Sequence, residues 1–269
     1  MLRLVLSVLL GLIALPAVAG DAGMVVLQTA DDSSGWDAVG KLMLGDRGFC
    51  TGALIAPHLV LTAAHCLFDK ETGVQMRAED IQFYAGWRNG RAVAYRSVRR
   101  AVAHPDYRYT GADKLERVNS DLALLELNQP IRLPSLTPFE TDDASPVEGD
   151  TVGVVSYAQD RAEVPSIQEV CEVLAERATT LILSCIVDFG SSGAPVFSIR
   201  DGVARVVSVI SAKAEVDGRK VALAVPLAAP LGVLKAALAK SRADPARPAA
   251  EGVNVLSGAR DGGAKFIKP

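Results

Sequence analysis

Short apolar runs separated by turn residues recur along most of the chain, and they limit the folds that it can adopt. The runs are rich in leucine and β-branched residues. They are Ala53–Ile55, Val60–Ala63, Ile81–Ala85, Leu122–Leu127, Thr151–Tyr157, Thr180–Ile186, Val203–Ser211 and Lys220–Val225. This pattern predicts an all-β protein, either a sandwich or a barrel, and periodicity alone does not choose between the two.

Length and charge narrow the class of protein further. The 269 residues are enough for one large or two small domains with a sizeable core. The formal net charge is −3, and no run of basic residues offsets it. We therefore expect neither a nucleic-acid nor an anionic-membrane partner, because both favour basic surfaces.

The N-terminus has the pattern of an export signal. Arg3 precedes the apolar run Leu4–Leu15, and Ala17–Ala19 fits the small-residue cleavage rule. An uncleaved membrane anchor is the alternative, but the run is short for a span of about 20 residues. We expect a signal peptide over 1–19, then an N-terminal segment or short propeptide over 20–35, and a secreted or periplasmic protein.

Four cysteines in an exported chain indicate two disulfides, for which three pairings are possible. The cysteines are Cys50, Cys66, Cys171 and Cys185. They form no CxxC motif, and no histidine pair has ligand spacing. The sequence therefore predicts no zinc site, and we expect no metal or cofactor.

Three segments carry side chains used in nucleophilic catalysis, in the order His65, Asp121, Ser192. They are TAAHC (Thr62–Cys66), SDLALLEL (Ser120–Leu127) and GSSGAP (Gly190–Pro195). In this order and context they resemble the trypsin/chymotrypsin-like serine proteases, over about 36–240. Two features make the chain similar to the bacterial secreted branch that includes glutamyl endopeptidases. One is the 71-residue interval from Asp121 to Ser192, and the other is that a serine, Ser191, immediately precedes Ser192.

The resemblance implies a role for each of these residues. His65 would be the general base, Asp121 would orient it, and Ser192 would attack the substrate, with the N–H groups of Gly190 and Ser192 as the oxyanion hole. Each has a simpler alternative: a core histidine, an exposed aspartate opening a strand, and a glycine/serine turn. Ser191 is the rival nucleophile.

The resemblance also implies the architecture: two packed six-stranded antiparallel β-barrels with a C-terminal helix. The first barrel would span about 36–134 and the second about 147–240. The composition of 241–269, rich in Ala, Pro, Gly, Arg and Asp without an apolar period, separately predicts a mostly disordered tail. The apolar spacing of Leu231, Leu234 and Leu238 after Pro230 predicts that helix. The family's helix is expected to pack on the second barrel.

Family positions suggest the disulfides and the substrate pocket. Cys50 and Cys66 match the family's bridge beside the histidine, which leaves Cys171 to pair with Cys185. Matching positions place Ile186 at the pocket floor and Ser211 and Lys213 on the strand that pairs with substrate. An apolar floor with a nearby lysine favours a small apolar or an acidic residue before the scissile bond.

Together these features predict a monomeric serine endopeptidase that acts on proteins or peptides through an acyl-enzyme intermediate. The alternative is a non-catalytic relative that uses the same barrels as a protein-binding module. A lipase-like hydrolase is disfavoured because its order is Ser, Asp, His and its motif is Gly-x-Ser-x-Gly, which this chain lacks.

Overall fold

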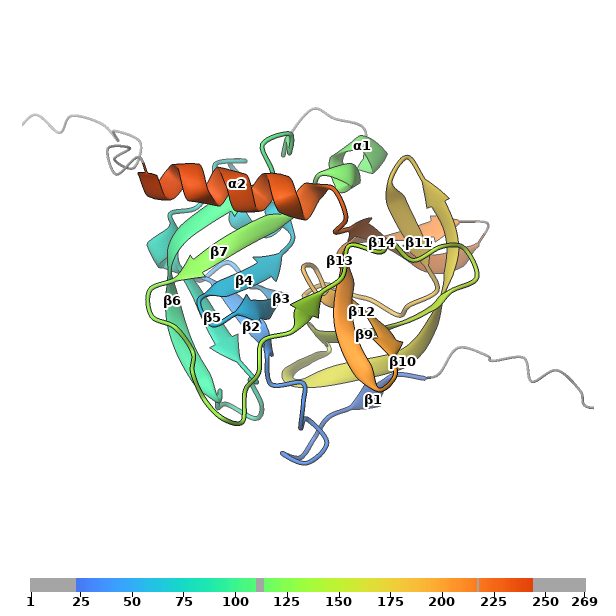
Figure 1. Ribbon diagram of the computed structural model, residues 1–269, viewed down its shortest axis with the longest axis horizontal. Coiled ribbons are helices and arrows are strands. Elements are labelled where there is room, and N and C mark those ends of the chain that lie inside the picture. The colour runs from blue at the N-terminus through green and yellow to red at the C-terminus, as the bar shows by residue number, and fades with distance from the viewer. Residues whose placement is uncertain (1–22, 110–113, 217, 244–269) are drawn as a thin grey trace, which may run out of the picture.

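The computed structural model describes residues 23–109, 114–216 and 218–243 (Figure 1). The predicted signal peptide, 1–19, lies outside these residues. So does the predicted tail, apart from its first three residues, which are helical.

A closed barrel of six antiparallel strands forms the first half of the described chain. The strands pair in the order β2-β3-β4-β7-β6-β5. Their bounds are β2 Val39–Leu44, β3 Phe49–Ala56, β4 Leu59–Thr62, β5 Ile81–Ala85, β6 Ala94–Ala103 and β7 Ala123–Leu127. β4 and β7 are buried throughout, which explains why their sequences are almost continuously apolar.

The second half is a sheet whose central strands also pair in a ring, β9-β10-β11-β14-β13-β12 and back to β9. Their bounds are β9 Thr151–Ala158, β10 Arg161–Arg177, β11 Thr180–Leu183, β12 Pro195–Arg200, β13 Val203–Val216 and β14 Arg219–Pro226. Two short strands extend it: β1 (Val25–Val26) pairs with β10, and β8 (Glu140–Thr141) pairs with β13 in parallel. The prediction of an all-β, two-barrel fold is confirmed (Figure 1).

Helices are few and short in the described residues. They are the 3₁₀ turns η1 (Ala64–Leu67) and η2 (Ala78–Asp80), and the α-helices α1 (Lys114–Asn119) and α2 (Pro230–Ala243). None of the helices in this part of the chain is long and apolar enough to cross a membrane.

The C-terminal helix α2 buries the predicted face, Leu231, Leu234 and Leu238. The expectation that it packs on the second barrel is wrong, because α2 lies against β6 and β7 of the first barrel (Figure 1). Its three leucines join the core of that barrel, and Arg242 forms an ion pair with Glu126 of β7 at 3.1 Å. The helix thus ties the end of the second barrel to the first.

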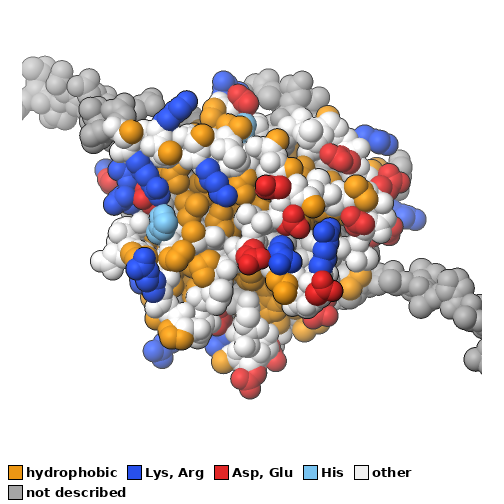
Figure 2. All heavy atoms as spheres, viewed as in Figure 1, with side chains coloured by type: hydrophobic (Ala, Val, Ile, Leu, Met, Phe, Trp, Pro, Cys, Tyr) orange, Lys and Arg blue, Asp and Glu red, His pale blue; other side chains and the backbone are white. Residues whose placement is uncertain are grey.

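Both predicted disulfides are present. Cys50–Cys66 joins β3 to η1, and Cys171–Cys185 joins β10 to the segment that follows β11. On the face in Figure 2, basic side chains predominate on the left, over the first barrel, and most acidic side chains lie at the centre and right, with apolar patches between them.

Candidate active site

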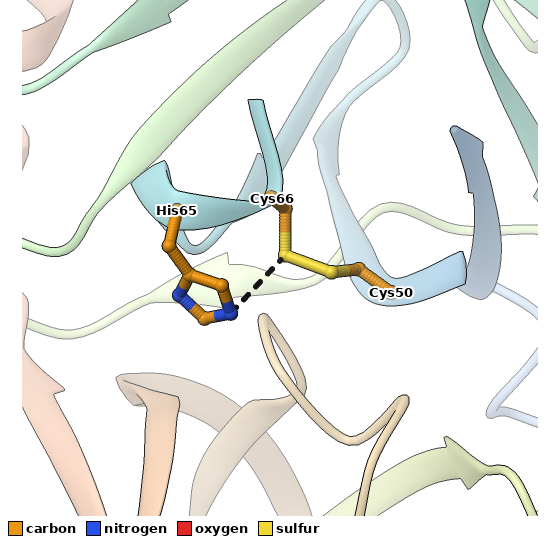
Figure 3. Close-up of side chains that lie close together, drawn as sticks. All are labelled: Cys50, His65 and Cys66. Atoms are coloured by element: carbon orange, nitrogen blue, oxygen red, sulfur yellow. Dashed lines mark hydrogen bonds between the residues drawn. A yellow bond between two sulfur atoms is a disulfide. The ribbon is translucent and has the colours of Figure 1, made fainter. Parts of the chain in front are cut away.

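His65 lies in η1, immediately after the buried strand β4. Because β4 is fixed in the core of the first barrel, the turn that follows presents the imidazole at the barrel's end, where a quarter of the side chain is exposed. The Cys50–Cys66 disulfide lies beside the ring, with Cys66 Sγ 3.8 Å from His65 Nε2 (Figure 3). The disulfide therefore restrains the turn that holds the imidazole.

Asp121 lies between α1 and β7 and is only 3% exposed. Its Oδ1 accepts the backbone N–H of His65 at 2.7 Å, and its Oδ2 lies 2.7 Å from His65 Nδ1. The Ser211 hydroxyl, from β13 of the second barrel, also donates to Oδ2. A buried carboxylate needs such partners, and they hold the imidazole with Nδ1 turned toward the acid and Nε2 away from it.

In the described structure, the loop from Asp188 to Ala194 leaves two of its backbone N–H groups without an acceptor. The other five are bonded: those of Asp188, Phe189, Ser191, Gly193 and Ala194. Within the residues that the structure describes, no acceptor receives the N–H of Gly190 or of Ser192. These are the two donors that the sequence motif predicts for an oxyanion hole.

Two serines in this loop have different surroundings. Ser191 is fully buried, and its hydroxyl contacts Ser156 Oγ at 3.4 Å and the Tyr157 carbonyl at 3.3 Å. Ser192 is partly exposed and lines a cavity of about 370 Å³ together with His65. In the described structure no hydrogen bond joins His65 to Ser192, although both line the same cavity.

Cys50, His65 and Cys66 lie close enough together to be considered as metal ligands (Figure 3). The two sulfur atoms are bonded to each other, so neither offers the thiolate that a metal would bind. The cluster is therefore unsuited to holding a metal ion in its oxidised form.

Residues 50–209 match the family described as the trypsin-like peptidase domain. The chain belongs to this family. A solved structure of a Glu endopeptidase in complex with MPD matches with a TM-score of 0.67 and 20% identity, over 83% of this chain and 100% of that chain. This confirms the trypsin-like fold.

Curated relatives match over shorter stretches. A complement C1r subcomponent-like protein of Mus musculus is 35% identical over 91 residues, and its Rattus norvegicus counterpart is 34% identical over 91 residues. These stretches are 32% of this chain in both cases, and 18% and 19% of the relatives. The chain thus spans less than a fifth of either relative's length.

The residues predicted to bind substrate are divided between neighbouring cavities of this peptidase domain. Ser211 and Lys213 line the cavity that holds His65 and Ser192. Ile186 lines an adjacent cavity of about 330 Å³, and its N–H donates to Gln168 Oε1 at 2.8 Å. Val187, one residue later, lines both cavities. Val187, rather than Ile186, therefore borders the cavity beside Ser192, where the pocket floor is expected.

A third cavity, of about 620 Å³, extends from His65 and Asp121 along β13. Tyr107, Tyr109 and Arg117 also line it, and burial raises the pKa of the Tyr107 phenol. No sequence motif predicts these three side chains at the site. Tyr107 belongs to the His-Pro-Asp-Tyr string before Asp121, which is the available signal.

Proposed function

We propose that the protein is a secreted or periplasmic serine endopeptidase that cleaves protein or peptide substrates. Ser192 would be the nucleophile, His65 the general base and Asp121 the residue that orients His65. Family membership supports a peptidase, and the observation that carries the finer proposal is the pair of free amides, Gly190 and Ser192, in the loop bordering the His65 cavity.

In the first half of the reaction, Ser192 Oγ attacks the scissile carbonyl carbon and its proton passes to His65 Nε2. The carbonyl oxygen becomes an oxyanion, which the N–H groups of Gly190 and Ser192 stabilise. Collapse of this intermediate breaks the C–N bond, and the imidazolium gives its proton to the leaving amine. Removing one such oxyanion donor typically costs about 100- to 1000-fold in rate.

In the second half, water attacks the acyl-enzyme ester. His65 takes a proton from the water, and the oxyanion forms again between the same two amides. Breaking the ester bond returns the proton to Ser192 and releases the acid product. Throughout, the Asp121 carboxylate, held by its hydrogen bonds from His65 and Ser211, stabilises the transient imidazolium.

The location belongs to the same proposal. Two disulfides persist most readily in an oxidising compartment, which supports export. The export pattern of residues 1–19 points the same way. We further propose that the working form is a monomer.

Labelling with a fluorophosphonate probe tests the assignment of the nucleophile. Folded wild-type protein is expected to label, whereas Ser192→Ala and His65→Ala are expected to stay blank. Ser191→Ala is the matched control, because the buried Ser191 hydroxyl cannot reach the probe, and it should still label.

Labelling that disappears in Ser191→Ala and survives in Ser192→Ala would reverse the assignment. A wild-type protein that is folded, as judged by its thermal unfolding, yet does not label or cleave a peptide library would favour the alternative of a protein-binding module.

A further inference from the structure

Lys41 is a buried lysine of the first barrel whose ammonium contacts the second barrel. It lies in β2, and only 6% of the residue is exposed. Its Nζ donates to the Ala162 carbonyl at 3.1 Å and lies 3.6 Å from Oε1 of Glu163, and both residues are near the start of β10. Lysines are rarely buried to this extent, because a buried charge is costly unless it has partners. These contacts make Lys41 a link between β2 and the hairpin that β9 and β10 form.

The Lys41 ammonium also lies against the aromatic ring of Phe49. The Nζ is 4.4 Å from the ring centre, a distance at which cation–π attraction acts. The edge of the same ring lies against Gly190, where an added Cβ would be 2.4 Å from Phe49 Cε2. Gly190 has a φ of +96°, a conformation that favours glycine. The Phe49 ring therefore contacts both the Lys41 ammonium and the backbone of Gly190.

The hairpin bonded to Lys41 also holds the peptide unit between Phe189 and Gly190. The N–H of Gln159, in the turn between β9 and β10, donates to the Phe189 carbonyl at 2.7 Å. In a trans peptide the C=O and N–H bonds point in opposite directions, and the described chain contains no cis peptide. The N–H of Gly190 therefore points away from the hairpin, and no described acceptor receives it.

We propose that Lys41 is a positioning residue for the oxyanion hole: it holds the Phe49 ring and the β9–β10 hairpin, and these two supports fix the direction of the Gly190 N–H. This rests on the proposed function, since it requires that Gly190 stabilises the oxyanion. A donor of this kind acts best when it is aimed before the reaction begins. Lys41 is not among the described residues that line the cavity beside Ser192, so it acts through these supports and not on the substrate.

Binding of a peptide aldehyde and of the corresponding peptide alcohol tests the proposal. Ser192 Oγ adds to the aldehyde carbon, and its proton passes through His65 to the carbonyl oxygen. The hemiacetal that forms places this oxygen between the two amides, whereas the alcohol has no carbonyl there and binds without reacting. The peptide is the one that wild-type protein cleaves best in a library. The measured quantity is the ratio of the alcohol to the aldehyde dissociation constant.

Lys41→Met keeps the length of the side chain and removes the ammonium. The ratio should fall about 10- to 100-fold, because the Gly190 N–H is no longer held in direction, while the alcohol should bind as it does to wild type. Ser208→Ala is the matched control, since it too leaves a backbone carbonyl without its side-chain donor. The buried Ser208 hydroxyl donates to the Val225 carbonyl at 2.8 Å, within the second barrel, and its loss should leave the ratio unchanged.

An unchanged ratio in folded Lys41→Met overturns the proposal. Equal losses of affinity for the alcohol and the aldehyde would show that Lys41 only supports the fold, which also overturns it. If Lys41→Met does not fold, Phe49→Leu decides, because it removes the ring between the ammonium and Gly190: a lower ratio supports the proposal and an unchanged ratio overturns it. Failure of the proposed function is seen separately, as wild-type protein that neither labels with the fluorophosphonate probe nor binds the aldehyde more tightly than the alcohol.

Discussion

At the scale of single residues, Gly193 shows how closely the Ser192 loop, Asp188–Ala194, approaches the first barrel. Its φ is +80°, and its N–H donates to the Ile210 carbonyl at 2.7 Å. A Cβ at this position would lie 2.1 Å from Thr62 Oγ1 and 2.3 Å from the Thr51 carbonyl oxygen. Glycine is required here for two separate reasons, the backbone conformation and the lack of space.

Alanine substitution at two glycines separates these reasons. Gly202 has a similar φ of +75° but no atom within 4 Å of an added Cβ. Gly202→Ala should lower the free energy of unfolding by about 1 kcal/mol, from backbone strain alone. Gly193→Ala should cost at least about 3 kcal/mol and abolish probe labelling, because the loop must move. Urea unfolding of both variants measures the difference, and equal costs would contradict this account.

At the scale of secondary-structure elements, the two disulfides close loops of similar length in different places. The sequence separations are 16 residues for Cys50–Cys66 and 14 for Cys171–Cys185. In the chain-entropy account, each bridge stabilises the fold by about 3 kcal/mol, with little difference between them. Their effects on the site should differ, because only Cys66 contacts the imidazole.

Replacing each pair of cysteines by alanine tests this. Both double variants should lose about 3 kcal/mol in the free energy of unfolding. At a temperature where both remain folded, the rate of probe labelling should fall more in the Cys50/Cys66 variant, because the turn that holds His65 is no longer restrained. Equal labelling rates would show that η1 is held by β4 alone.

Elements with continuous apolar runs were predictable from sequence, and elements with mixed composition were not. The run Ile81–Ala85 is β5 itself, and the leucine spacing after Pro230 predicted the buried face of α2. By contrast β6 and β10 carry charged residues along their length, and β10 contains Pro165, so neither has an apolar run to mark it. Each of these strands takes its place by pairing with its neighbours, β6 in the first barrel and β10 in the second.

Within the candidate site, motifs pointed to His65, Asp121 and Ser192, but not to the contacts between the barrels. The Ser211 hydroxyl bonds to Asp121, and the Lys213 ammonium bonds to Asp188. Both contacts form because β13 passes beside the segments that hold the two aspartates. No local pattern encodes such a crossing. The packing of α2 on the first barrel was missed for the same reason.

At the scale of the whole molecule, the candidate site depends on how the two barrels are joined. His65 and Asp121 come from the first barrel and Ser192 from the second. Thr51, a buried residue of β3 in the first barrel, links them: its N–H donates to the Ser192 carbonyl at 2.8 Å, and its hydroxyl donates to the Gly190 carbonyl at 2.8 Å. The hydroxyl also accepts the N–H of Tyr157 in β9 at 3.1 Å.

Thr51→Val keeps the shape of the side chain and removes the hydroxyl. It leaves the Gly190 carbonyl and the Tyr157 N–H without this partner, so the free energy of unfolding should fall by about 2 to 4 kcal/mol. The labelling rate of the folded variant should fall at least about tenfold, since a hydrogen bond that positions the Ser192 loop relative to His65 is lost.

Thr180→Val is the matched control, because the buried Thr180 hydroxyl donates to Asn119 Oδ1 and not to the Ser192 loop. It should lower stability while folded protein labels at the wild-type rate. If the two variants label equally fast, the backbone bond from Thr51 to Ser192 is enough to align the barrels, and the hydroxyl contributes only stability.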